Sequence, residues 1–268
     1  MKATAAIAVN VFRESVRDKV LYNLVAFAIL LIGASYLIGQ LTAGQDVKII
    51  KDLGLGATSM FGLFIAVFIG IGLVSKEVER RSIYSLLSKP IHRYQLVLGK
   101  FFGLLLTLAV NLSVMAAALY AVLGLMIWLG DPSLRVVIEA PPIDPRLLVA
   151  FALVFVELSL VTAIALCLST FSTPIVAAAL TFGLYVVGHF SGDLRNFRDA
   201  VDSPTAARLA SGLYWVLPNL AQFDVKSDIV HGHPIAAGYI GVTVAYAVVY
   251  AAMLLTLSVL IFSRRDFK

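Results

Sequence analysis

The chain has 268 residues, of which 60% are hydrophobic and only 14% are charged, and its mean hydropathy is +0.93. Soluble domains are about 45–50% apolar and about 25% charged. This composition therefore argues against an ordinary cytosolic enzyme, a disordered chain and a nucleic-acid-binding domain. The net charge of +5 is read first as a topology signal, because basic residues in membrane proteins gather on the cytoplasmic side. The single cysteine, Cys167, excludes an internal disulfide and a cysteine-based zinc site.

Residues 1–20 predict an amphipathic helix that lies on the membrane surface before the first span. The apolar positions recur at steps of three and four residues, and the polar positions occupy the opposite face. The apolar face comprises Val9, Phe12, Val16 and Val20, and the polar face comprises Asn10, Arg13, Glu14 and Arg17. A simple charged flank of the first span is the alternative.

Residues 21–268 contain six apolar runs, each a candidate membrane-spanning helix. A bilayer core of about 30 Å needs about 20 helical residues. The sequence thus predicts an all-α, polytopic membrane protein. The fifth run is the weakest, since it is short and contains two glycines, and we expect a broken or re-entrant ending near His189. The runs are Leu21–Leu41, Leu55–Ser75, Phe101–Leu129, Leu147–Thr170, Pro174–Phe190 and Ile235–Phe262.

The basic residues predict the orientation of these spans. Most of the 21 Lys and Arg residues lie in the first twenty residues, in the loop 76–100 or in the C-terminal tail. Six spans place these three segments on one side, which the positive-inside rule assigns to the cytoplasm. Both termini are therefore expected to be cytoplasmic, and the long loop 191–234 is expected to be external.

The cytoplasmic loop 76–100 has features of a docking platform. Its middle carries a helical apolar face of Ile83, Leu86 and Leu87, flanked by charged residues, and Pro90 ends that helix. A second short helix is expected to start near His92 and to lead into the third span. Two short helices parallel to the membrane would give a soluble partner a surface to push against. An ordinary positively charged loop is the alternative.

This loop resembles the characteristic loop of the type-2 ATP-binding-cassette (ABC) permeases. That family has roughly Glu-x-Glu-x-Gly-Thr, then Leu-Leu-Ser-x-Pro, an Arg, and Leu-Gly-Lys at the next span. The sequence departs from the pattern at Arg81-Ser82, where the family commonly has Gly-Thr, and its tail 262–267 also looks like the family's usual ending. The matching residues are Glu77, Glu79, Leu86, Leu87, Ser88, Pro90, Arg93, Leu98, Gly99 and Lys100.

The resemblance implies a permease subunit of an ATP-driven exporter in a bacterial or archaeal plasma membrane. Two permease subunits, identical or different, would pair in the lipid, and each would dock a separate ATPase that binds ATP and Mg²⁺. The short turn 171–174 would be a second contact. The chain itself contains no Gly-x-x-x-x-Gly-Lys-Ser/Thr loop, so no cofactor is expected in it. The expected ATPase-coupling residues are Glu77, Glu79, Arg80, Arg81, Ile83, Leu86, Leu87, Pro90 and Arg93.

Glu157 lies in the middle of the fourth span. A charged residue there costs about 2.5–3.5 kcal/mol on insertion scales, so Glu157 is expected to face protein or water. It either lines a cargo path or is a buried structural group bonded to a polar residue such as Asn111. We favour the structural role. The sequence does not identify the cargo.

Other functional classes leave weaker signals in the sequence. An intramembrane hydrolase would use a serine and a histidine, but Gly188-His-Phe-Ser-Gly192 has the wrong glycine spacing for a rhomboid-like site. The pair His231 and His233 supplies too few ligands for a metal, with Asp228 at best a third. A secondary transporter would need several midplane carboxylates, and only Glu157 qualifies. A complex that transmits force across the membrane would have the same sequence features as an exporter.

Overall fold

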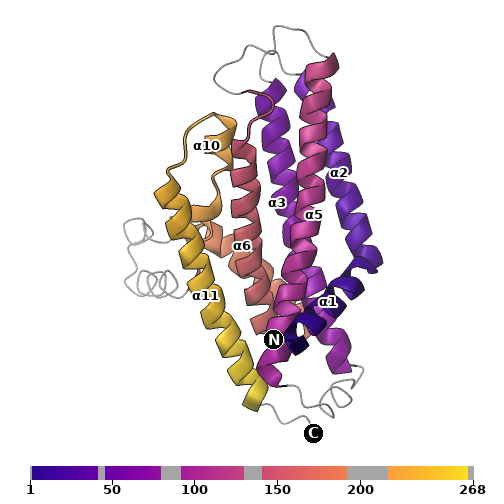
Figure 1. The fold of residues 1–268 in the computed structure, drawn as a ribbon, viewed down its shortest axis with the longest axis vertical. Coiled ribbons are helices and arrows are strands. Elements are labelled where there is room, and N and C mark those ends of the chain that lie inside the picture. The colour runs from indigo at the N-terminus through magenta and orange to yellow at the C-terminus, as the bar shows by residue number, and fades with distance from the viewer. Residues whose placement is uncertain (1, 42–45, 80–91, 130–140, 192–216, 265–268) are drawn as a thin grey trace, which may run out of the picture.

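The computed structural model describes residues 2–41, 46–79, 92–129, 141–191 and 217–264. All regular secondary structure in these ranges is helical, which confirms the all-α prediction. Six longer helices follow the N-terminal one, and a small unit of two short helices lies between the last two of them (Figure 1). The elements are α1 (Lys2–Val16), α2 (Lys19–Gln40), α3 (Asp46–Glu79), α5 (Arg93–Leu129), α6 (Arg146–Ser169), α7 (Pro174–His189), η2 (Ala221–Phe223), α10 (Lys226–Val230) and α11 (Ala237–Arg264).

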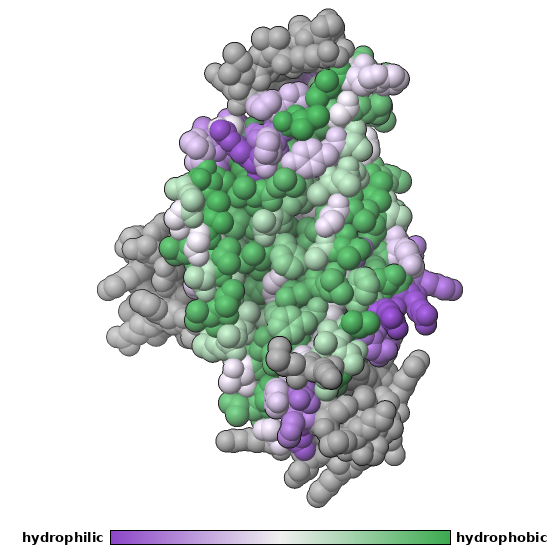
Figure 2. Space-filling view, in the orientation of Figure 1, coloured by the Kyte–Doolittle hydropathy of each residue, from purple (hydrophilic) through white to green (hydrophobic). Residues whose placement is uncertain are grey.

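The long helices form a bundle whose centre is α3 and α6. Both are mostly buried inside the protein, whereas α2 and α11 expose most of their apolar surface. α6 packs against α3, α5, α7 and α11. Figure 2 shows hydrophobic residues covering the middle of the visible face, with hydrophilic residues toward its upper and lower parts. This arrangement is that of a protein whose outer helices face lipid, because no water is available there to make apolar exposure costly.

Five of the helices are long and apolar enough to cross a membrane, and the sixth, α7, has 16 residues. At 1.5 Å per residue, α7 is about 24 Å long, shorter than the bilayer core. It runs unbroken from Pro174 to His189, so neither Gly183 nor Gly188 interrupts it. The helix ends at His189, and a re-entrant course after residue 191 would lie outside the described residues. α1 and the C-terminal end of α11 lie at the same end of the bundle, at the bottom of Figure 1.

α3 begins nine residues before the predicted start of the second span. The apolar criterion placed that start at Leu55, because charged residues precede it, but the helix begins at Asp46. Lys51 explains the difference. Its side chain is fully buried, and its Nζ donates a 2.7 Å hydrogen bond to the carbonyl oxygen of Pro141. The charge of Asp144 also acts on it. A buried lysine that is paired in this way is compatible with a packed helix.

α1 confirms the predicted N-terminal helix, but it buries a different face. The residues packed into the protein include Ile7, Val11 and Ser15, whereas Val9 of the predicted apolar face is 44% exposed. The prediction assumed one apolar face against lipid. In the structure α1 lies across α5, so a second face is buried against protein, while Phe12 and Val16 of the predicted face are half-buried. The helix ends at Val16, four residues before the predicted end, and Val20 belongs to α2.

The crossing of α1 and α5 depends on two glycines four residues apart. A Cβ atom at Gly99 would lie 2.7 Å from the Ile7 side chain, and one at Gly103 would lie 2.6 Å from the Ala8 carbonyl oxygen. Small residues at this spacing allow close approach of two helices in a membrane. Gly99 is also part of the Leu-Gly-Lys motif. The close packing of α1 against α5 explains why a residue without a side chain is needed at this position of the motif.

We expect Gly103→Ala to destabilise the protein by about 1–3 kcal/mol, because the new methyl group meets backbone that cannot move without shifting α1. The matched control is Gly124→Ala on the same helix, where a Cβ atom meets nothing within 4 Å. That change should be neutral or stabilising by up to about 1 kcal/mol, since alanine is the better helix former. Thermal unfolding of the purified variants checks this. Equal midpoints for the two variants would mean that the crossing tolerates a side chain.

Candidate functional site

The start of α5 is tied to the end of α11 by Arg93. His92 precedes the helix, and its backbone N–H donates to the side-chain oxygen of Gln95, which caps the first turn. Arg93 Nη1 donates a 2.9 Å hydrogen bond to the carbonyl oxygen of Phe262 and also bonds that of Ser263. The last carbonyls of a helix have no partner within it and carry the negative end of its dipole. A guanidinium at this position donates to these carbonyl oxygens and places a positive charge at the negative end of the dipole. It also joins α5 to α11.

The other predicted coupling residues are placed only in part. Glu77 and Glu79 belong to the last turns of α3, and nothing is described of their side chains. The second short helix expected near His92 is instead the first part of α5, which continues into the span without a break. The remaining residues fall outside the described ranges, so their contact with an ATPase stays a prediction. These are Arg80, Arg81, Ile83, Leu86, Leu87 and Pro90.

Glu157 lies inside the bundle on α6, with 1% of its surface exposed. Its Oε1 atom is 3.3 Å from Nε2 of His189 at the end of α7. Tyr185 also lies beside the carboxylate, and its ring packs 4.5 Å from that of His189. Neither oxygen of Glu157 receives a well-aligned hydrogen bond from the described residues. The nearest described neighbours of the carboxylate are therefore His189 and Tyr185 of α7, and these contacts join α6 to α7.

Asn111, the partner suggested from the sequence, does not pair with Glu157. Its side-chain amide donates a 2.7 Å hydrogen bond to the carbonyl oxygen of Thr107, one turn earlier on α5. An amide satisfied within its own helix does not need a partner on another. The observed partner of Glu157 is His189, which the sequence identified only as the end of a weak span.

Residues 219–220, in the loop that the sequence predicts to be external, pack against the end of α7 beside His189. The Leu220 N–H donates to the Gly188 carbonyl oxygen at 3.0 Å, and the Ser191 hydroxyl donates to the Asn219 side chain at 2.7 Å. Gly188 permits this contact, because a Cβ atom there would lie 2.9 Å from the Leu220 side chain. Residues 192–216 of this loop lie outside the described ranges.

Two further charges lie close to this buried group. Asp224 and Lys226 follow η2, and their Oδ1 and Nζ atoms are 3.6 Å apart. Both are near enough for their charges to act on the Glu157 carboxylate. The described part of the molecule thus places one cluster of polar groups from α6, α7 and the Asn219–Lys226 segment near the middle of α6, away from the end of the bundle where Arg93 lies.

The geometry does not assemble a hydrolase. The His189 ring directs Nε2 at Glu157 and has its Nδ1 3.2 Å from the Tyr185 carbonyl oxygen, while the Ser191 hydroxyl donates to Asn219. Within the described residues this serine and this histidine therefore do not form a nucleophile–base pair. Among those same residues no group of three His, Cys, Asp or Glu side chains could hold a metal ion.

Comparison with protein families decides the class of this membrane protein. The model of the family described as "ABC-2 family transporter protein" matches residues 5–267. The chain belongs to the ABC-2 family. It is a multi-pass membrane permease component of an ABC transporter, and components of this family lack an ATPase domain of their own. No curated protein matches the chain.

Proposed function

We propose that this ABC-2 permease couples ATP hydrolysis by a separate ATPase subunit to the export of a cargo across a bacterial or archaeal plasma membrane. The observation that carries the proposal is the family match over almost the whole chain. The loop motif supports it, because that motif lies between α3 and α5, the helices that lead directly into the bundle. Two permease subunits would pair in the membrane, each with one ATPase.

Arg93 supports a specific route for the coupling. A docked ATPase would move the segment between α3 and α5, and Arg93 sits where that segment enters α5. Its hydrogen bonds to the last carbonyls of α11 would pass the motion to a second helix. α11 packs along α6, the helix that carries Glu157. The sequence predicts Arg93 as an ATPase-coupling residue, whereas its observed hydrogen-bond partners lie within the permease.

The test is co-purification of the permease with the candidate ATPase, followed by ATP turnover of the reconstituted complex. We expect Arg93→Ala to retain ATPase binding within about threefold and to reduce permease-dependent stimulation of ATP turnover by about tenfold or more. Arg93→Lys should recover part of the stimulation, since an ammonium also donates to carbonyl oxygens but sits on a more flexible side chain without the fixed planar donors of a guanidinium. Loss of binding equal to the loss of stimulation would place Arg93 in the ATPase contact instead.

A further inference from the structure

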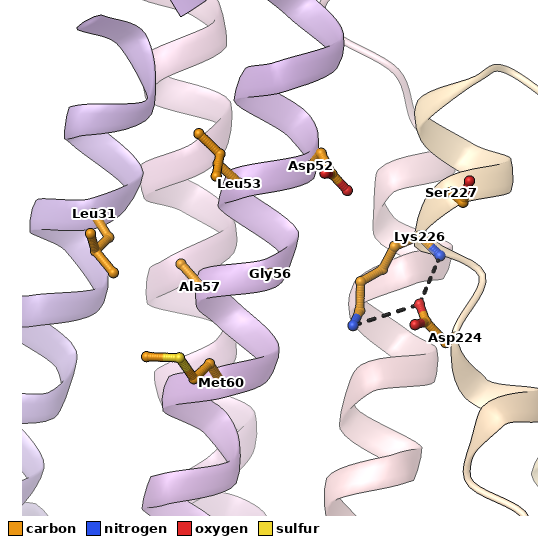
Figure 3. Close-up of a pocket in the computed structure, with 9 residues that line it drawn as sticks. All are labelled: Leu31, Asp52, Leu53, Gly56, Ala57, Met60, Asp224, Lys226 and Ser227. Atoms are coloured by element: carbon orange, nitrogen blue, oxygen red, sulfur yellow. Dashed lines mark hydrogen bonds and ion pairs between the residues drawn. The ribbon is translucent and has the colours of Figure 1, made fainter. Parts of the chain in front are cut away.

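A pocket of about 490 Å³ opens between α2, α3 and the start of α10, apart from the coupling end and from the interior of the bundle (Figure 3). One part of its lining is charged or polar and the other is apolar. In Figure 3 Asp52 points from α3 toward Lys226, and Met60 lies lower on the same helix. The lining residues are Leu31, Asp52, Leu53, Gly56, Ala57, Met60, Asp224, Lys226 and Ser227.

The Asp52 end of the pocket lies at the depth of lipid headgroups. Asp52 is the last charged residue of α3 before the uncharged stretch Leu53–Ser75. It lies six residues after the start of the helix, about 9 Å along the axis. The headgroup layer on each side of a bilayer core is about 5–8 Å thick. Leu53 and Met60 then face the hydrocarbon, where 40% and 46% of their surfaces are exposed.

The charges suit a headgroup that carries both signs. Asp52 is an exposed carboxylate and can accept hydrogen bonds from an ammonium group. Across the pocket, Lys226 contacts Asp224 through one of its three donor directions and has the others available for phosphate oxygens. The pocket therefore offers an acceptor for a cation and a donor for an anion, on opposite walls. With two acidic residues and one basic residue, it disfavours a headgroup that is only anionic.

The apolar wall suits an acyl chain. Leu31 on α2 and Leu53 and Met60 on α3 are all partly exposed beside the charged groups. Leu53 and Met60 are seven residues apart, about 10 Å along α3 and toward the bilayer centre. An acyl chain attached to a headgroup near Asp52 would extend over this wall.

We propose that this pocket binds a phospholipid with a primary ammonium headgroup, of the phosphatidylethanolamine type. Asp52 binds the ammonium, Lys226 binds the phosphate, and Leu31, Leu53 and Met60 contact the first part of an acyl chain. A phosphatidylcholine headgroup has the same charges but no N–H group to donate to Asp52, so it binds less well. The site does not depend on ATP coupling. It would hold α2, α3 and the Asp224–Ser227 segment in one arrangement.

The experiment measures lipid adducts on the purified full chain by native mass spectrometry, with phosphatidylethanolamine and phosphatidylcholine of equal chain length supplied together. We expect wild-type protein to retain phosphatidylethanolamine about three- to tenfold better, the range of one exposed charge-assisted contact. Asp52→Asn should bring the two lipids to equal retention. Lys226→Gln should reduce retention of both.

The matched control is Asp228→Asn, which removes a carboxylate from the same short helix. Asp228 is exposed, lies 3.5 Å from His233 and does not line the pocket. It should leave the lipid preference unchanged. The proposal fails if wild-type protein does not distinguish the two lipids, or if Asp52→Asn keeps the preference. It also fails if the pocket variants change only the amount of dimer, since the pocket would then be a contact between two copies.

Discussion

Leu86→Asp is expected to detach the ATPase from the permease. In the proposed coupling helix, Ile83, Leu86 and Leu87 form one apolar face that a groove on the partner would bury. Each buried side chain contributes about 1.5–3 kcal/mol, and a buried unpaired carboxylate adds a desolvation cost of several kcal/mol. Together these exceed 4 kcal/mol, which lowers affinity by about a thousandfold. Co-purification of the ATPase measures the loss directly.

Ser85→Asp is the matched control for this prediction. Ser85 directly precedes Leu86 in the sequence, but on a helix it lies on the face opposite to Ile83 and Leu87. The same charge there should leave binding within about threefold. Both variants should melt at the wild-type temperature as isolated permeases. If Leu86→Asp and Ser85→Asp retain the ATPase equally well, this segment is not the docking helix. The prediction that it couples the ATPase to the permease would then be wrong.

Much of the fold could be predicted from the sequence, because few backbone structures are possible inside a membrane. Every apolar run became a helix, since backbone groups in lipid must bond within their own segment. The start of α3 could not be predicted from hydropathy. Lys51 is acceptable in that helix only because the Pro141 carbonyl oxygen accepts from it, 90 residues away in the chain. The buried face of α1 was missed for the same reason, since it is set by the glycines of α5.

Only part of the candidate site could be predicted from the sequence. Glu157 was found from its type and position alone, but its partner was not. A usable signal did exist. α6 and α7 are joined by the short turn 170–173, so residues at similar distances from that turn on the two helices come to the same depth. His189 lies close to the depth of Glu157 by this count, whereas Asn111 was chosen for polarity without a geometric argument. Family resemblance located the coupling loop but not the contacts of Arg93.

Glu157→Leu is expected to destabilise the permease by about 1–3 kcal/mol, the usual cost of leaving a buried polar group without its partner. His189 would keep its place inside the bundle and lose the group that faces its Nε2 atom. His189→Leu should cost a similar amount by stranding Glu157. The double variant Glu157→Leu/His189→Leu should be less destabilised than the sum of the two, because it strands neither partner. Chemical unfolding in detergent measures all four proteins, and strictly additive losses would mean that the pair is not energetically coupled.

Glu157→Gln separates a structural role from a role in the cargo path. The amide keeps the shape of the side chain and an oxygen that faces His189, so expression, assembly and the unfolding midpoint should stay close to wild type. If Glu157 only holds α6 against α7, ATP turnover of the complex and its stimulation by the permease should also be retained. A Gln variant that assembles fully but loses that stimulation would contradict the structural role. It would then assign the Glu157 charge to the transport step, in the middle of α6 beside the Asn219–Lys226 segment.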